Sequence, residues 1–119
     1  MTLIDLFRNY RDKYMRSSVE RLDFPKFPTD EVRRYKIIFS GIVQGVGFRY
    51  EAWLIAEKLE LTGFAENLPS GDVYMEIQGP KNKIMHLIKC MESIRRISID
   101  QKVIDELPMI EETSFKPIY

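Results

Sequence analysis

Three glycines lead directly into an arginine in the segment Gly41-Ile42-Val43-Gln44-Gly45-Val46-Gly47-Phe48-Arg49. An apolar alternation over residues 35–39 precedes this segment and a helical periodicity follows it, so we expect a strand–loop–helix junction. Glycine adopts positive φ readily and lets a ligand approach the main chain. Backbone N–H groups gathered at the N-terminus of a helix attract anions. The planar, protonated guanidinium of Arg49 adds donors that fit two phosphoryl oxygens, so the segment predicts an anion site.

The expected elements follow the order β-α-β-β-α-β. They are a strand over 35–39, a helix over 48–60, a hairpin of strands 64–68 and 73–78, a helix over 81–94 and a strand over 97–104. Residues 114–119 add a short edge strand, because Pro117 cannot donate to a ladder. We place Gly63 just after the first helix, where a residue with positive φ is commonly required. The order predicts an α+β, ferredoxin-like sandwich with two helices on one face of a mixed, mainly antiparallel sheet.

Residues 1–34 are expected to extend a domain that covers residues 35–119. A helix predicted over residues 1–23 carries a single apolar stripe, formed by Leu3, Leu6, Phe7, Tyr10 and Tyr14. Two prolines then make residues 24–28 a linker. The stripe must be buried, and its own domain is the favoured surface. A homodimer through this helix, or another protein partner, is the alternative.

Composition limits the partners of this 119-residue chain, which is long enough for one domain. Eighteen basic residues balance eighteen acidic ones, so no net field attracts nucleic acid or a membrane surface. A single cysteine excludes an intramolecular disulfide and a cysteine-cluster metal site. The sequence shows no secretory signal and no apolar run near the ~20 residues that span a bilayer. We therefore expect a cytoplasmic protein with no nucleic-acid or membrane partner.

The glycine segment, together with Gly63-Phe64-Ala65-Glu66-Asn67 and Gly71-Asp72-Val73, resembles the acylphosphatase family. The hallmark of that family is the motif V-Q-G-V-G-F-R followed by G-[WF]-x-x-N. The resemblance covers roughly residues 35–119. It implies the ferredoxin-like fold and a hydrolase that splits an acyl phosphate into carboxylate and inorganic phosphate without cofactor or metal. In that family the loop and the arginine hold the phosphate, and the asparagine positions the attacking water. The phosphate-holding role falls on Gln44, Gly45, Val46, Gly47, Phe48 and Arg49, and the water-positioning role on Asn67.

A catalytically silent module that binds phosphate or an acyl phosphate is the alternative function, and an interaction protein that uses its N-terminal helix is a third. The presence of both Arg49 and Asn67 favours the enzyme. No role is expected of Glu51 or Asp72, because a carboxylate near the phosphate would repel it. His86 is expected to be solvated, and Cys90, on the same helix, to be partly buried.

Overall fold

A computed structural model describes residues 2–3, 22 and 24–119 of the chain. The helix expected over residues 1–23, and the homodimer contact expected of it, rest on residues outside this description. The elements are β1 (Val32–Ile42), α2 (Phe48–Lys58), β2 (Thr62–Asn67), β3 (Val73–Pro80), α3 (Lys81–Ser93), β4 (Ser98–Leu107) and β5 (Phe115–Ile118). The predicted β-α-β-β-α-β order, with a short strand after it, is confirmed.

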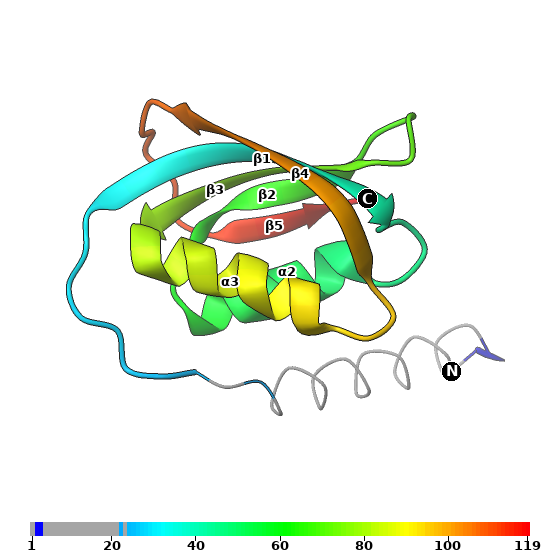
Figure 1. Cartoon of the computed structure of the whole chain (residues 1–119), viewed down its shortest axis with the longest axis horizontal. Helices are drawn as coiled ribbons and strands as arrows, with labels where there is room; N and C mark the ends of the chain where they lie inside the picture. Colours follow the sequence, from blue (N-terminus) through cyan, green and yellow to red (C-terminus); the bar gives the residue numbers. More distant parts are fainter. Residues whose placement is uncertain (1, 4–21, 23) are drawn as a thin grey trace.

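The strands form one sheet in the order β4-β1-β3-β2-β5. Only β2 and β5 pair in parallel, and all other neighbours are antiparallel. Figure 1 shows α2 and α3 side by side on one face of this sheet. The predicted ferredoxin-like α+β sandwich is therefore confirmed, and β5, which contains Pro117, lies at an edge of the sheet as expected.

The core fills the space between the sheet and the two helices. Alternate residues of the central strands and the apolar stripes of both helices are buried there, among them Ile37, Phe39, Met75, Ile77, Ala52, Ile55, Ile84, Leu87 and Met91. Cys90 is buried in the same core, more fully than the partial burial expected for it. Among the described residues, no helix is long and apolar enough to cross a membrane.

The C-terminal end of β1 directs the chain into the glycine segment. β1 begins at Val32, three residues before the predicted strand, and its pairing with β4 shifts register between Ser40 and Gly41. Gly41 has a φ of +130°, and a Cβ at this position would lie 2.2 Å from the carbonyl oxygen of Ser98. This close approach requires glycine, and the irregularity bends the end of the strand.

The end of α2 differs from the expectation for Gly63. Glu60, with a φ of +59°, supplies the left-handed residue after the helix. The N–H groups of Glu60 and Leu61 donate to the carbonyls of Glu57 and Ala56, which is the Schellman arrangement. Gly63 instead lies inside β2, where a Cβ would come 1.9 Å from the carbonyl oxygen of Glu76. It is required by the close packing of two strands, not by the helix end.

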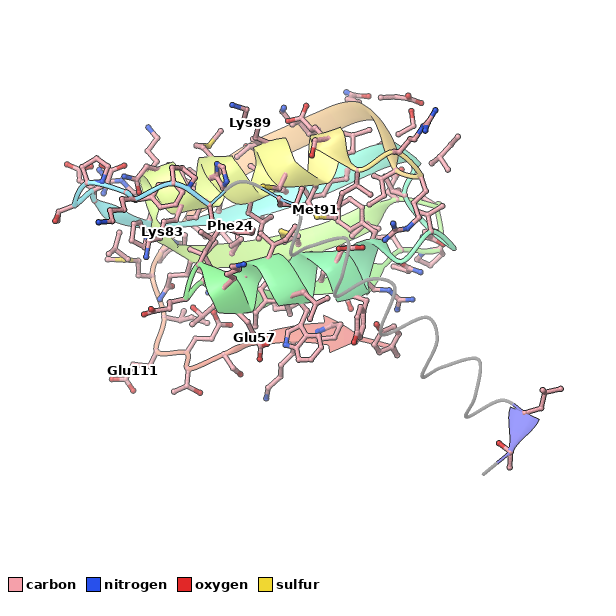
Figure 2. The ribbon with its side chains drawn as sticks, turned by 90° about the horizontal axis from the view of Figure 1, so that it is seen from below. Phe24, Glu57, Lys83, Lys89, Met91 and Glu111 are labelled. Atoms are coloured by element: carbon pink, nitrogen blue, oxygen red, sulfur yellow. The ribbon has the colours of Figure 1, made fainter. Side chains whose placement is uncertain are left out.

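Residues 24–31, which we call the strap, precede β1 and pack on the helices (Figure 2). The Phe24 and Phe27 rings lie 5.8 and 5.2 Å from the His86 ring, and the Lys58 ammonium lies 4.6 Å from the Phe24 ring centre. His86 is thus half-buried between aromatic rings, and the expectation of a solvated histidine is wrong. No pattern in the sequence predicts that the linker packs back on α3.

Polar contacts also hold the strap. The side chain of Asn82 donates to the Pro28 carbonyl at 2.8 Å, and its backbone N–H donates to Asp30 Oδ2 at 2.9 Å. Because α3 has no side-chain cap of its own, the Asp30 carboxylate takes the place of an N-cap for this helix.

Candidate active site

The loop between β1 and α2 has two residues in the left-handed conformation. Gly45 has a φ of +74°, and Gly47, with a φ of +78°, is the N-cap residue of α2. No side chain caps the helix at this residue, so its first backbone N–H groups have no side-chain acceptor there. Together with the positive end of the helix dipole, they provide the electrostatics of an anion site.

Gln44 fastens this loop to the turn between β2 and β3. Its amide nitrogen donates to the carbonyls of Leu68 and Asp72, both at 2.8 Å. The predicted hairpin turn therefore helps to hold the loop after β1 in place. The side chain of Gln44 is used in this contact, so any contribution of Gln44 to an anion site would come from its backbone.

A cleft of about 450 Å³ opens beside the loop. It is lined by Val43, Gly45, Val46, Gly47, Phe48, Arg49, Tyr50, Asn67, Arg96 and Tyr119. Five of the six predicted phosphate-holding residues, all but Gln44, therefore line one cleft together with Asn67. Phe48 is buried with its ring 5.0 Å from that of Phe39, so it offers the cleft its backbone.

Arg49 is oriented by the end of the chain. Its Nη1 donates to the carbonyl oxygen of Ile118 at 2.6 Å, and its guanidinium carbon lies 4.3 Å from the centre of the Tyr119 ring. Figure 1 shows the C-terminus at the same end of the molecule as the loop after β1. A hydrogen bond and a cation–π contact thus direct the guanidinium from one side.

Asn67 enters the cleft from the last position of β2. Its Oδ1 is buried and accepts no hydrogen bond from any described residue. A buried acceptor without a partner is costly in a folded protein, and it is commonly found where a ligand or water is meant to bind. The side-chain amide can accept from one group and donate to another.

Glu51, for which no role was expected, is fully buried next to the loop. Its carboxylate pairs with Arg96, whose Nε donates to the Val46 carbonyl at 2.8 Å. Burial raises the pKa of Glu51, and the hydrogen bond and charge of Arg96 offset part of that rise. The sequence held one signal for this pair: Glu51 follows Phe48 by three positions on the apolar stripe of the helix, and a buried acid needs a partner.

Tyr50 and Tyr119 are further cleft residues that were not predicted. Tyr50 contacts Trp53 edge to face, with ring centroids 5.4 Å apart. The side chain of Asp72 accepts a hydrogen bond from the Ser70 hydroxyl at 3.0 Å within the hairpin turn, and its backbone carbonyl accepts the bond from Gln44. Across the described part of the chain, no three His, Cys, Asp or Glu side chains are grouped so that they could hold a metal ion.

The fold and the cleft define a class of small α+β proteins with a glycine-rich strand–loop–helix junction at one end of the sheet. The model of the acylphosphatase family matches residues 35–117. The chain therefore belongs to the acylphosphatase family, as the motifs predicted.

Individual relatives agree with this assignment. An acylphosphatase of Clostridium beijerinckii is 49% identical over 55 residues, which cover 46% of this chain and 61% of the relative. An acylphosphatase of Vibrio parahaemolyticus is 38% identical over 86 residues, which cover 72% of this chain and 90% of the relative. The crystal structure of acylphosphatase from Bacillus subtilis superposes with a TM-score of 0.68 at 28% identity and covers 75% of this chain and all of that one. The activity that follows is hydrolysis of acyl phosphates to carboxylate and inorganic phosphate.

Proposed function

We propose that this hydrolysis takes place in the cleft at the end of β1, with Arg49 and the backbone of residues 44–48 binding the phosphate and Asn67 positioning the water. The observation that carries the proposal is the buried, unpartnered Oδ1 of Asn67 in the cleft that Arg49 and the glycine loop line. Arg49 and the loop N–H groups can bind an anion there, and the Asn67 amide oxygen can accept a hydrogen bond from a neutral molecule beside it.

These separate roles, phosphate binding and water positioning, follow from the chemistry of an acyl phosphate. In-line transfer needs little base catalysis because the carboxylate is a good leaving group, but charge spreads over the equatorial oxygens of the phosphoryl group. The loop N–H groups and Arg49 neutralise this charge. The water oxygen bonds to phosphorus while the bond between phosphorus and the carboxylate oxygen breaks. The proton of the water passes to a phosphate oxygen, because an asparagine amide aligns water but does not take up its proton.

Two substitutions test these roles. Arg49→Ala removes a contact to the phosphoryl group in both the bound state and the transition state, so phosphate binding and turnover should fall together. Asn67→Ala leaves the anion site in place, so phosphate affinity should stay near that of the wild type while kcat falls by about 10²-fold. Lys89→Ala, on the outer face of α3, is the control for loss of a positive charge (Figure 2).

The measurements are phosphate binding by calorimetry and hydrolysis of benzoyl phosphate, with folding checked by circular dichroism. Full kcat in Asn67→Ala would refute the water-positioning role. Unchanged phosphate affinity in Arg49→Ala would refute the phosphate site. If the wild type binds phosphate but does not hydrolyse benzoyl phosphate, the silent binding module becomes the correct function.

The division of the chain into an extension, residues 1–34, and a catalytic domain, residues 35–119, is also a proposal. It is supported by the family match, which begins at residue 35. Because β1 begins at Val32 and the strap packs on the helices, the test is deletion of residues 1–23, which leaves both intact. Hydrolysis should stay within a few-fold of that of the full chain. A cytoplasmic location and a homodimer through residues 1–23 remain predictions, the second testable by comparing the sedimentation of the two proteins.

A further inference from the structure

We propose that Arg96 and Glu51 form a positioning pair that holds the phosphate loop in its binding conformation. The inference rests on the proposed function, because it takes the loop between β1 and α2 as the phosphate site. It assigns a role to Arg96, which lines the cleft from the segment between α3 and β4, and to a buried carboxylate of α2.

The first step is the geometry of one peptide unit. Arg96 Nε donates to the carbonyl oxygen of Val46 at 2.8 Å. The peptide bond between Val46 and Gly47 is trans and planar, so its C=O and N–H groups point in opposite directions. Fixing the Val46 carbonyl on Arg96 therefore also fixes the direction of the Gly47 N–H, one of the donors expected to face the phosphate.

The second step is that this loop needs external fixing. Gly45 and Gly47 both have positive φ, and glycine gives up more conformational freedom on ordering than any other residue. Gln44 secures the start of the loop to the β2–β3 turn through two carbonyls. Arg96 secures the other end, where the loop becomes α2.

The third step is the link to the helix. Nη2 of Arg96 donates to Oε1 of Glu51, and the Glu51 backbone N–H donates to the Gly47 carbonyl at 3.0 Å. One guanidinium therefore bridges a loop carbonyl and a carboxylate in the first turn of α2. The planar fork of arginine suits this bridge, whereas a lysine ammonium offers a single compact head. The positive charge of Arg96 also compensates the negative charge of Glu51, which would otherwise weaken anion binding at the cleft.

The alternative is that the ion pair between Arg96 and Glu51 stabilises the fold and has no effect on phosphate binding. Phosphate affinity of the folded protein separates the two roles, because a purely structural pair lowers the melting temperature without changing the affinity of molecules that remain folded. Removing Arg96 alone leaves a buried, unpaired carboxylate, which is strongly destabilising. The test therefore uses the double variant Glu51→Gln/Arg96→Met, which removes both charges and keeps the volume of both side chains.

The matched control is Arg95→Met, which makes the same change at the preceding, exposed residue. Arg96→Lys is the conservative variant. All proteins are titrated with inorganic phosphate by calorimetry well below their melting temperatures and assayed with benzoyl phosphate. We expect the double variant to bind phosphate at least about tenfold more weakly and to lose about 10²-fold in kcat/KM, because a misaligned loop donor matters most in the transition state. Arg96→Lys should recover part of both losses, and Arg95→Met should stay within twofold of the wild type.

A folded double variant with wild-type phosphate affinity and kcat/KM would overturn the inference and leave a structural ion pair. Arg49→Ala, measured in parallel, keeps that failure apart from failure of the proposed function. If Arg49→Ala loses phosphate binding while the double variant keeps it, only the positioning pair is wrong. If neither variant affects phosphate binding, the phosphate site itself has been misassigned.

Discussion

Replacing Gly63 with alanine tests the close packing of β2 on β3. A Cβ at this position would lie 1.9 Å from the Glu76 carbonyl oxygen, whereas real Cβ atoms essentially never approach such an atom within 3.0 Å. The two strands would have to separate locally by at least 1.1 Å, which is the difference between these distances. The φ of +138° is also one that side chains other than glycine rarely adopt.

The cost of this substitution can be worked from the two effects. A backbone held in a sparsely populated region costs about 1–3 kcal/mol. Separation of the strands weakens ladder hydrogen bonds on either side of Gly63, each worth about 1 kcal/mol. We therefore expect Gly63→Ala to lower the free energy of unfolding by about 3–5 kcal/mol, a large part of the 5–15 kcal/mol typical of a domain.

Urea unfolding followed by circular dichroism measures this loss, and Gly71→Ala is the matched control. Gly71 lies in the turn of the same hairpin and also has a positive φ, +97°, but no atom lies within 4 Å of the position of its Cβ. Gly71→Ala should lower the free energy of unfolding only by the cost of the left-handed backbone conformation, about 1–2 kcal/mol. If Gly63→Ala is no more destabilising than Gly71→Ala, the argument from close strand packing is refuted.

Four further expectations concern the strap, the buried carboxylate, the orientation of Arg49 and the absence of a metal. Asp30→Ala should lower the free energy of unfolding by about 1 kcal/mol in thermal unfolding, since it removes the acceptor of the Asn82 N–H, and equal stability would show that the strap does not cap α3. Because burial raises the pKa of Glu51 above its ordinary value of 4.5, the wild type should lose stability relative to Glu51→Gln as pH rises from 4.5 through the folded-state pKa; a constant difference in melting temperature across that range would contradict this. Tyr119→Ala should lower kcat/KM about threefold through loss of the cation–π contact that orients Arg49, and an unchanged value would show that the ring is not needed. Hydrolysis should continue undiminished in excess EDTA, and activity that a divalent ion restores after chelation would contradict a metal-free mechanism.

Local signals in the sequence were enough to predict the order of elements. The alternation around Ile37 and the periodic stripe around Leu87 both reflect burial on one face, and both side chains are buried. The bounds of the edge strand β4 were harder to predict from the sequence. The strand covers residues 98–107, whereas residues 97–104 were predicted. Most of its side chains are exposed, so its extent depends on backbone pairing with β1, which leaves little pattern in the sequence.

The site was only partly predictable. Arg49 and Asn67 lie in motif segments, and the fold brings both to one cleft, although their catalytic roles stay predictions. Arg96 contacts Val46 of the loop, 50 positions away, and Ile118 contacts Arg49 at the start of α2, 69 positions away. No periodicity or spacing connects segments so distant along the chain, because the sheet topology alone sets which ends meet.

The edge-to-face contact between Tyr50 and Trp53 has a practical consequence. Trp53 is the single tryptophan of the chain, so indole fluorescence has one source, and Tyr50, whose ring contacts the indole, is one of the residues that line the cleft. A ligand that seats against Tyr50 should alter the surroundings of the indole and therefore its emission. The unmodified protein then carries its own optical signal of occupancy, and stopped-flow mixing could time the arrival and release of phosphate without a label.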